Sequence, residues 1–283
     1  MSLVLVLGAT GNQGSAVVDA LERLGHDIRA MVRDTEGEAS ARLRERGIAT
    51  VVGDFDDLDS LTEAARGTDA MFAMTTPAAG TDAEIRQGRN LADAALAAGT
   101  GHLVYSSVAS ADRSTGIPHF DSKAEVERYI RGLALPWSIV GPVWFMENLA
   151  FPWNLEDYAD GRLRLALRRD RTLQMISSAN IGRFCAYVID RREPFVGERI
   201  DIAADQHVGP AIADALGAAM GRTLAYEELP LAEEAVRFED SATMYEWIGR
   251  VGFAVDIAAL HADHPDVDWI DLASWARTQT WAP

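Results

Sequence analysis

Residues 3–14 read LVLVLGATGNQG, and this stretch decides the fold of the 283-residue chain. The continuous apolar run Leu3–Leu7 predicts a buried strand of a parallel sheet. The segment Asn12–Leu24 predicts a helix with an apolar face. Gly8, Gly11 and Gly14 therefore lie between a strand and a helix N-terminus, where free N–H groups and the helix dipole attract a pyrophosphate. This context predicts a dinucleotide-binding loop of G-x-x-G-x-x-G spacing, with a glycine-rich turn that holds no ligand as the alternative.

Each of the three glycines has its own expected task in this loop. Gly8 allows a tight turn at the end of the strand, Gly11 lets the backbone approach the pyrophosphate, and Gly14 permits close packing of helix on strand. The intervening residues belong to the same predicted cofactor site. The predicted loop thus comprises Gly8, Ala9, Thr10, Gly11, Asn12, Gln13 and Gly14.

The first half of the chain continues as an alternation of short apolar runs and helix-like segments. The predicted strands are 28–32, 50–52, 70–74, 103–106 and 137–140, and the predicted helices are 38–46, 58–65, 83–98 and 120–132. Strict β-α alternation with short connections predicts an α/β fold, a doubly wound parallel sheet with helices on both faces.

The pattern loosens after Gly141, where aromatic residues and prolines gather. Helices are predicted at 181–190, 210–220 and 232–238, and strands at 199–203 and 224–227. We therefore expect a nucleotide-binding domain over residues 1–150 and a smaller α/β domain over 151–283, packed as the substrate or partner side. Whether segments near 175–205 return to the first sheet stays open.

Composition excludes several classes of protein. The net charge of −17 argues against direct binding to nucleic acids and against binding to anionic membrane surfaces. The single cysteine, Cys185, allows no intrachain disulfide and suggests no metal site. The longest apolar stretch, 133–146, is too short to span a bilayer, and the N-terminus lacks a signal-peptide pattern. A cytoplasmic protein is the expectation. Of 26 basic residues, only Lys123 is a lysine.

The choice of dinucleotide depends on Arg33-Asp34, at the end of the second predicted strand. An arginine there can pair with a 2′-phosphate through its planar guanidinium, which favours NADP(H) over NAD(H). Asp34 keeps the second choice open, because an acidic residue at this distance from the loop typically binds the ribose 2′-OH of NAD.

Several motifs together resemble the NmrA-like family of atypical short-chain dehydrogenases/reductases, and most closely its NADPH sensors. The resemblance is specific over residues 3–150 and diffuse beyond. It is carried by the loop Gly8–Gly14, Arg33, Val51–Asp54, Glu84–Arg89, Tyr105–Ser107, His119–Lys123 and Phe145–Asn148, with a weaker match at Leu272–Trp275.

The resemblance implies a Rossmann fold with a small C-terminal domain, and it implies cofactor contacts. Arg33 would hold the adenosine phosphate, and Arg86 would reach toward the cofactor. Pro77 departs from the polar or aromatic residue expected at its position. The remaining implied contacts are Asp54 and Phe55 at the adenine, Thr75, Thr76 and Pro77 along the cofactor, and Lys123, Phe145, Met146, Glu147 and Asn148 on the nicotinamide side.

The expected catalytic motif is altered in this chain. An ordinary short-chain dehydrogenase uses Tyr-x-x-x-Lys, whereas this chain has His119 four residues before Lys123. His119 either replaces the missing acid or packs the helix start, and Lys123 either holds the cofactor or also carries a proton. Ser106 and Ser107 stand where such enzymes bind substrate, or they merely cap the strand.

Two functions follow from these residues. The first is an NADP(H)-binding sensor or regulator that acts through a protein partner or a change of assembly. The alternative is an NADPH-dependent reductase, similar to isoflavone or quinone reductases, that acts on a small apolar or aromatic substrate.

Overall fold

The computed structural model describes residues 1–237 and 240–281. Its main feature is a seven-stranded sheet, in which the pairs among the first six strands are parallel. Reading from one edge, the order is β3-β2-β1-β4-β5-β6-β10. The strands are β1 (Leu3–Val6), β2 (Asp27–Val32), β3 (Ala49–Val52), β4 (Ala70–Met74), β5 (Leu103–Ser106), β6 (Trp137–Pro142) and β10 (Arg199–Ile202).

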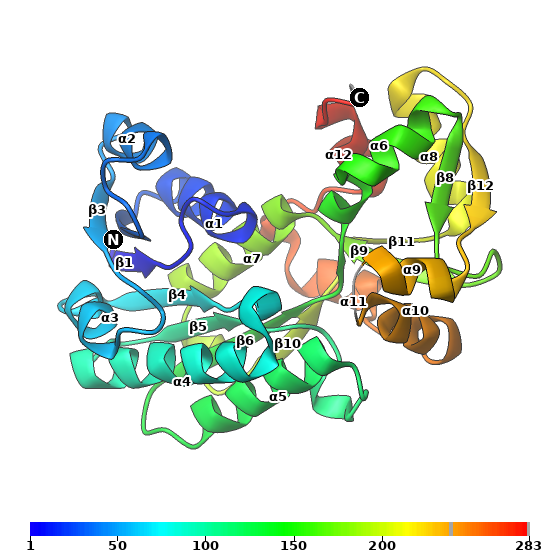
Figure 1. Cartoon of the computed structure of the whole chain (residues 1–283). Helices are drawn as coiled ribbons and strands as arrows, with labels where there is room; N and C mark the ends of the chain where they lie inside the picture. Colours follow the sequence, from blue (N-terminus) through cyan, green and yellow to red (C-terminus); the bar gives the residue numbers. More distant parts are fainter. Residues whose placement is uncertain (238–239, 282–283) are drawn as a thin grey trace. The chain divides into compact units, whose positions relative to one another are not determined.

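Helices cover both faces of this sheet, so the predicted doubly wound α/β fold is confirmed. In Figure 1, α4 and α5 lie below the strands, and α1 and α7 lie above them. The helices of this layer structure are α1 (Asn12–Arg23), α2 (Glu38–Glu45), α3 (Leu58–Ala65), α4 (Thr81–Ala98), α5 (Pro118–Arg131) and α7 (Ser178–Asp190).

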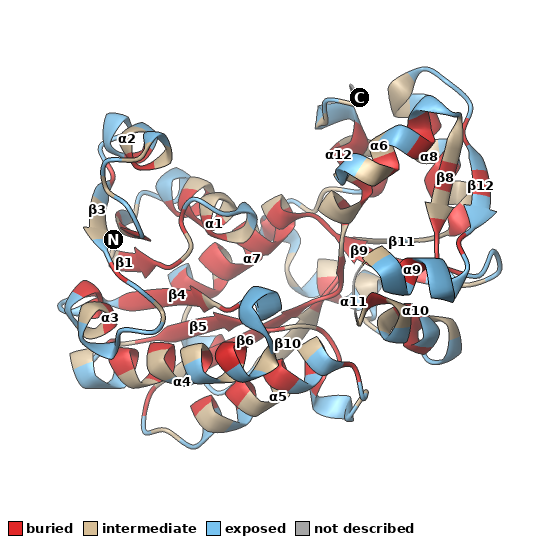
Figure 2. Cartoon of the chain, viewed as in Figure 1, coloured by how far each residue is buried: buried red, intermediate tan, exposed pale blue. Residues whose placement is uncertain are grey.

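Close packing of α4 on α5 depends on Gly88. A Cβ atom at this position would lie 2.4 Å from a methyl carbon of Val126. Figure 2 shows the resulting core as the red strands and the red inner faces of these helices. The cluster between sheet and helices includes Leu5, Leu91 and Ile139, all at most 1% exposed.

Contacts divide the chain into two units. Unit 1 holds residues 1–114, 119–141 and 181–201, and unit 2 holds 115–118, 142–180 and 202–283. The division at residue 150 stays a prediction. Unit 2 contains a three-stranded sheet, β11-β9-β7, and a parallel pair, β12-β8. Its elements are β7 (Trp144–Phe145), α6 (Pro152–Ala159), β8 (Arg162–Leu165), β9 (Thr172–Ile176), β11 (Asp205–Val208), α8 (Gly209–Met220), β12 (Ala225–Glu228), α9 (Leu231–Arg237), α10 (Ser241–Arg250), α11 (Ile257–Asp263) and α12 (Leu272–Thr278).

Sequence patterns located the elements of unit 1 within a few residues but missed many in unit 2. Strands β7, β8, β9 and β11 and helices α6, α10, α11 and α12 were not predicted. Phe238, the expected end of one helix, lies outside the described residues. Within residues 1–237 and 240–281, no helix is both long and apolar enough to cross a membrane.

Candidate functional site

The glycine loop joins β1 to α1 at the point where the strand order reverses. Gly8 adopts a left-handed φ of +63°, and its carbonyl accepts a hydrogen bond from Gly11 N at 2.8 Å. Gly11 is the N-cap of α1, whose first turn consists of the neutral residues Asn12–Ser15. Crevices at such reversal points, facing a helix N-terminus, are where parallel α/β sheets bind anionic ligands.

Gly14 and Gly11 differ in what surrounds them. A Cβ at Gly14 would lie 2.1 Å from the carbonyl oxygen of Gly8, so helix and strand pack directly backbone to backbone. A Cβ at Gly11 would meet only that same oxygen, at 3.4 Å. Gly11 is exposed together with Thr10 and Asn12, whereas Ala9 is buried. The loop is therefore an open backbone cradle that fits a pyrophosphate, and a side chain at Gly11 would fill it.

The end of β2 presents Arg33 to solvent. Within the part of the chain that the structure describes, its guanidinium has no hydrogen bond or ion pair. Asp34 is already committed to the following turn, because its Oδ1 accepts from Glu36 N at 2.9 Å and its carbonyl accepts from Ser40 Oγ at 2.5 Å. A free guanidinium beside an engaged carboxylate fits a phosphate better than a ribose hydroxyl.

The implied adenine contacts lie after β3. Asp54 is exposed, and its Oδ1 accepts from Asp56 N at 2.9 Å. Phe55 is partly buried against the core, and its carbonyl accepts from Asn90 Nδ2 at 3.0 Å. Both residues thus lie at the same end of the sheet as the glycine loop, because β1 and β3 run in the same direction and each is followed by one of these segments.

Arg86 is engaged by a residue that the sequence did not single out. Its Nε and Nη2 donate to Asp56 Oδ1 at 2.9 and 2.8 Å, and Gln87 Nε2 donates to Asp56 Oδ2 at 2.9 Å. The bonds from Gln87 and Arg86 lower the pKa of Asp56. Arg86 therefore contributes to a surface network joining α4 to the β3–α3 loop.

Lys123 is buried inside unit 1, with a side chain 10% exposed. Its ammonium lies 2.9 Å from Glu84 Oε1 and donates to the carbonyl and hydroxyl oxygens of Thr75, at 2.6 and 2.9 Å. An ammonium has three N–H donors, so these three acceptors match its full capacity. Burial lowers the pKa of Lys123, and the adjacent Glu84 carboxylate opposes this effect.

Glu84 is the centre of this network and is 0% exposed. Its carboxylate also accepts from Ser122 Oγ at 2.5 Å and from Thr75 Oγ1 at 3.1 Å. The Tyr105 hydroxyl lies 2.9 Å from Thr75 Oγ1, and burial raises its pKa well above the ordinary value. Elements α4, α5, β5 and the end of β4 are thus tied together by one buried polar cluster. The sequence pointed to Lys123 but not to its counter-ion.

Ser106 and Ser107 both have protein partners. Ser106 Oγ donates to Gln13 Oε1 at 2.6 Å, which links the end of β5 to the glycine loop. Ser107 Oγ donates to Glu127 Oε1 at 2.5 Å, and Arg199 Nε donates to the other oxygen of that carboxylate at 2.9 Å. Ser107 is therefore anchored to a buried charge pair, which explains its burial.

His119 and Pro77 occupy less buried positions. His119 is the second residue of α5, with its ring edge-on to Phe120 at a centroid distance of 4.8 Å. Thr76 and Pro77 are exposed, and Pro77 begins a 3₁₀ turn, Pro77–Ala79. Neither observation assigns these residues a ligand, so the implied cofactor contacts of Thr76 and Pro77 and the catalytic role of His119 stay predictions.

The segment Phe145–Asn148 lies in unit 2. Met146 is fully buried, and the Asn148 carbonyl accepts from Asn154 Nδ2 at 2.7 Å. Glu147 Oε1 accepts from Ser178 N at 2.8 Å, and burial raises the pKa of this carboxyl. The expected nicotinamide contacts of the segment stay a prediction.

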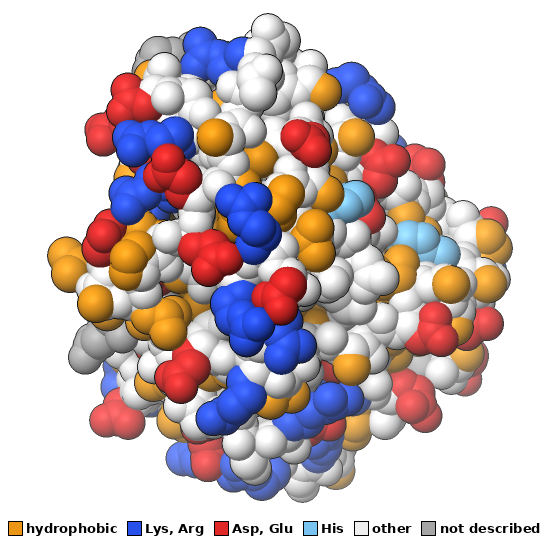
Figure 3. Space-filling model, turned by 90° about the vertical axis from the view of Figure 1, so that its right-hand side faces the viewer, with side chains coloured by type: hydrophobic (Ala, Val, Ile, Leu, Met, Phe, Trp, Pro, Cys, Tyr) orange, Lys and Arg blue, Asp and Glu red, His pale blue; other side chains and the backbone are white. Residues whose placement is uncertain are grey.

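Arginines around β8 are compensated by acidic neighbours. Three ion pairs join an arginine Nη2 to a carboxylate oxygen: Arg162 to Asp160 Oδ2 at 2.9 Å, Arg164 to Glu233 Oε2 at 2.7 Å, and Arg168 to Asp170 Oδ2 at 2.8 Å. On the face drawn in Figure 3, blue basic side chains are likewise interspersed with red acidic ones. These ion pairs support the interpretation that Arg162, Arg164 and Arg168 form part of a solvated surface of mixed charge.

Solved structures share the whole fold at low sequence identity. The transcriptional regulator NmrA has been solved with NADP and with NAD, and superposes with a TM-score of 0.81 in both cases. Identity is 22% and 21%, over 98% of this chain and 94% of that one. This similarity shows a common fold.

Curated relatives match the chain in part. An oxidoreductase of Aspergillus japonicus with an NmrA-like domain, himF, is 32% identical over 166 residues, covering 54% of this chain and 49% of that protein. The NAD(P)H azoreductase of Xenophilus azovorans is 32% identical over 148 residues, covering 52% and 50%. The chain spans about half the length of the curated relatives it matches.

The family model covers far more of the sequence than these pairwise matches. It extends over residues 1–264 and so includes the glycine loop, the Lys123 network and most of unit 2. The chain belongs to the NmrA-like family.

Proposed function

We propose that the chain binds NADP(H), with the pyrophosphate on the glycine loop and the 2′-phosphate on Arg33. The exposed, unengaged guanidinium of Arg33 beside the engaged Asp34 is the observation that carries the preference for NADP(H). The open cradle at Gly11 supports the placement of the pyrophosphate. NmrA, which shares the fold, has been solved with either dinucleotide, so the preference rests on this chain's own residues.

Replacing Arg33 tests this preference. We expect Arg33→Ala to weaken NADPH binding by about 10- to 100-fold, the loss of one or two charge-assisted hydrogen bonds, and to leave NADH affinity unchanged. Isothermal titration of both nucleotides measures the two dissociation constants. Arg66→Ala, which removes another exposed arginine, one paired with Glu63, is the matched control. Equal affinity of the unaltered protein for NADPH and NADH would refute the assignment.

We infer that cofactor binding serves regulation rather than catalysis. His119 stands where an ordinary short-chain dehydrogenase has its catalytic tyrosine. The Lys123 ammonium has three N–H donors and three acceptor atoms within reach, one on Glu84 and two on Thr75. A proton donor must reach the reacting atom within hydrogen-bond distance. A lysine held this way favours a protein that responds to its cofactor through a partner or a change of assembly.

A reductase is the second candidate, and the names of the curated relatives favour it. The similar proteins include an NAD(P)H azoreductase and an oxidoreductase with an NmrA-like domain. A quinone becomes a stabilised phenolate when it accepts a hydride, so water can supply the proton and no tyrosine is required. A small aromatic acceptor is therefore compatible with His119 and a buried Lys123.

Turnover separates the two candidates. For a regulator, we expect NADPH oxidation at background rate with quinones, aldehydes and enones, together with tight NADPH binding. The measurement is the loss of NADPH absorbance, with Lys123→Met assayed beside the unaltered protein. Turnover above background by the unaltered protein would reject the regulator and establish the reductase. Persistence of that turnover in Lys123→Met, if the variant stays folded and binds NADPH, would fit water as the proton source, whereas its loss would add a role for Lys123 in the reaction.

A further inference from the structure

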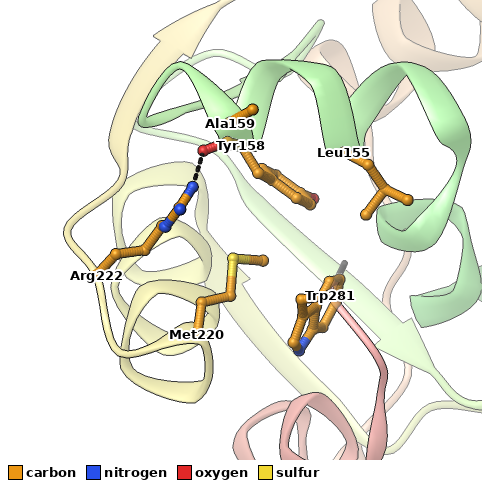
Figure 4. Close-up of a pocket in the computed structure, with 6 residues that line it drawn as sticks. All are labelled: Leu155, Tyr158, Ala159, Met220, Arg222 and Trp281. Atoms are coloured by element: carbon orange, nitrogen blue, oxygen red, sulfur yellow. Dashed lines mark hydrogen bonds between the residues drawn. The ribbon is translucent and has the colours of Figure 1, made fainter. Parts of the chain in front are cut away.

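A cavity of about 120 Å³ lies within unit 2, between α6, the C-terminal end of α8 and the residue Trp281. Figure 4 shows the side chains that surround it. An engineered protein cavity of about 150 Å³ binds benzene, so this space is of the size of one aromatic ring. Its lining residues are Leu155, Tyr158, Ala159, Met220, Arg222 and Trp281.

The walls present ring faces and aliphatic groups, because the polar atoms of both aromatic residues are already used. The Tyr158 hydroxyl donates to the Leu149 carbonyl at 2.8 Å, and Trp281 Nε1 donates to the Ala276 carbonyl at 2.8 Å. The two rings meet edge-on, with centroids 5.9 Å apart. Such an arrangement fixes both rings and favours an aromatic occupant.

Arg222 supplies the cavity with a positive charge. Its Nη1 donates to the Tyr158 carbonyl at 2.6 Å, which fixes the guanidinium at the cavity wall. Four of its five N–H donors remain available to a ligand. Among residues 1–237 and 240–281, no carboxylate lies within 4.0 Å of it. Arg162 and Arg164 of the same unit, by contrast, are paired with Asp160 and Glu233.

We propose that this cavity binds a small aromatic carboxylate. The ring lies among Leu155, Met220 and Trp281, and the carboxylate accepts hydrogen bonds from Arg222. A guanidinium matches a carboxylate bidentately, and the apolar walls select a ring. The proposal does not rest on the proposed function, because all six residues belong to unit 2 and none was assigned to the dinucleotide.

Benzoate is the probe, titrated into the full chain carrying ¹³C-methyl methionine. Because Met220 lines the cavity, we expect its methyl resonance, assigned by Met220→Leu, to shift saturably with a dissociation constant of about 1 mM or lower. Benzyl alcohol, which has the same ring but no charge, should bind about tenfold more weakly. This comparison uses the unaltered protein and so does not depend on whether any variant folds.

Two variants test the two halves of the site. Arg222→Gln should lower the affinity for benzoate to that for benzyl alcohol. Ala159→Leu, which fills the cavity from an exposed helix position, should lower the affinity for both compounds. Arg277→Gln, outside the cavity, is the control and should bind benzoate normally. The proposal is overturned if benzoate leaves the Met220 methyl unshifted, if benzyl alcohol binds equally well, or if folded Arg222→Gln binds benzoate as the unaltered protein does.

Discussion

Gly14→Ala is expected to lower the free energy of unfolding by about 3 kcal/mol, a decrease in Tm of roughly 6–12 °C, and to abolish tight NADPH binding. The added Cβ would lie 2.1 Å from the oxygen and 2.5 Å from the carbon of the Gly8 carbonyl, and 2.9 Å from Ala9 N. All three atoms belong to the backbone, so no side chain can rotate away. The helix must shift off the strand, which displaces the N–H groups that would bind the pyrophosphate.

Gly11→Ala is the matched control, because it adds the same methyl group three residues away. Its Cβ would touch only Gly8 O, at 3.4 Å, so we expect Tm within about 2 °C of the unaltered protein. NADPH affinity should nevertheless fall, since the methyl group occupies the open cradle. Thermal unfolding with and without NADPH measures both effects. Normal NADPH affinity in both variants would place the dinucleotide elsewhere.

The fold of unit 1 could be predicted largely because its central strands β1, β4, β5 and β6 are buried on both faces. Such strands are continuous apolar runs, as in Leu3–Val6 and Ala70–Met74. Strands of unit 2 lack this signal. Strand β8 reads RLRL, in which arginines alternate with leucines, and β11 reads DQHV. Short strands of this kind take their structure from their partners, which the sequence alone does not identify.

The candidate site likewise contains residues that the sequence could identify and residues that it could not. The glycine loop and Arg33 lie within local motifs whose spacing and position carry their meaning. Glu84 is 39 residues from Lys123 along the chain and falls in a helix whose other acidic residues, Asp82 and Asp93, are exposed and half-buried. Only the sheet order and the packing of α4 on α5 bring the two together. Tyr105 likewise belongs to an apolar strand, and its hydroxyl contact with Thr75 depends on the pairing of β4 with β5.

Breaking the Lys123–Glu84 pair should strongly destabilise the protein, because both side chains are buried. Lys123→Met leaves the Glu84 carboxylate buried without its counter-ion, which typically costs about 3–5 kcal/mol. We expect Tm to fall by roughly 10 °C. The double variant Lys123→Met/Glu84→Leu should regain most of this loss, because no unpaired charge remains. In the double variant, the Ser122 hydroxyl can still donate to the His119 carbonyl, and the Thr75 hydroxyl can still form its hydrogen bond with the Tyr105 hydroxyl.

An exposed pair provides the control for this comparison. Arg42 and Glu38 lie one helical turn apart with side chains 62% and 88% exposed, so Arg42→Met should change stability by less than about 0.5 kcal/mol. An unchanged Tm in Lys123→Met would show that the ammonium is not held in the buried network. The double variant also separates two roles of the lysine. If its Tm recovers while NADPH affinity stays low, Lys123 contributes to the cofactor site as well as to the fold; if both recover, its role is structural.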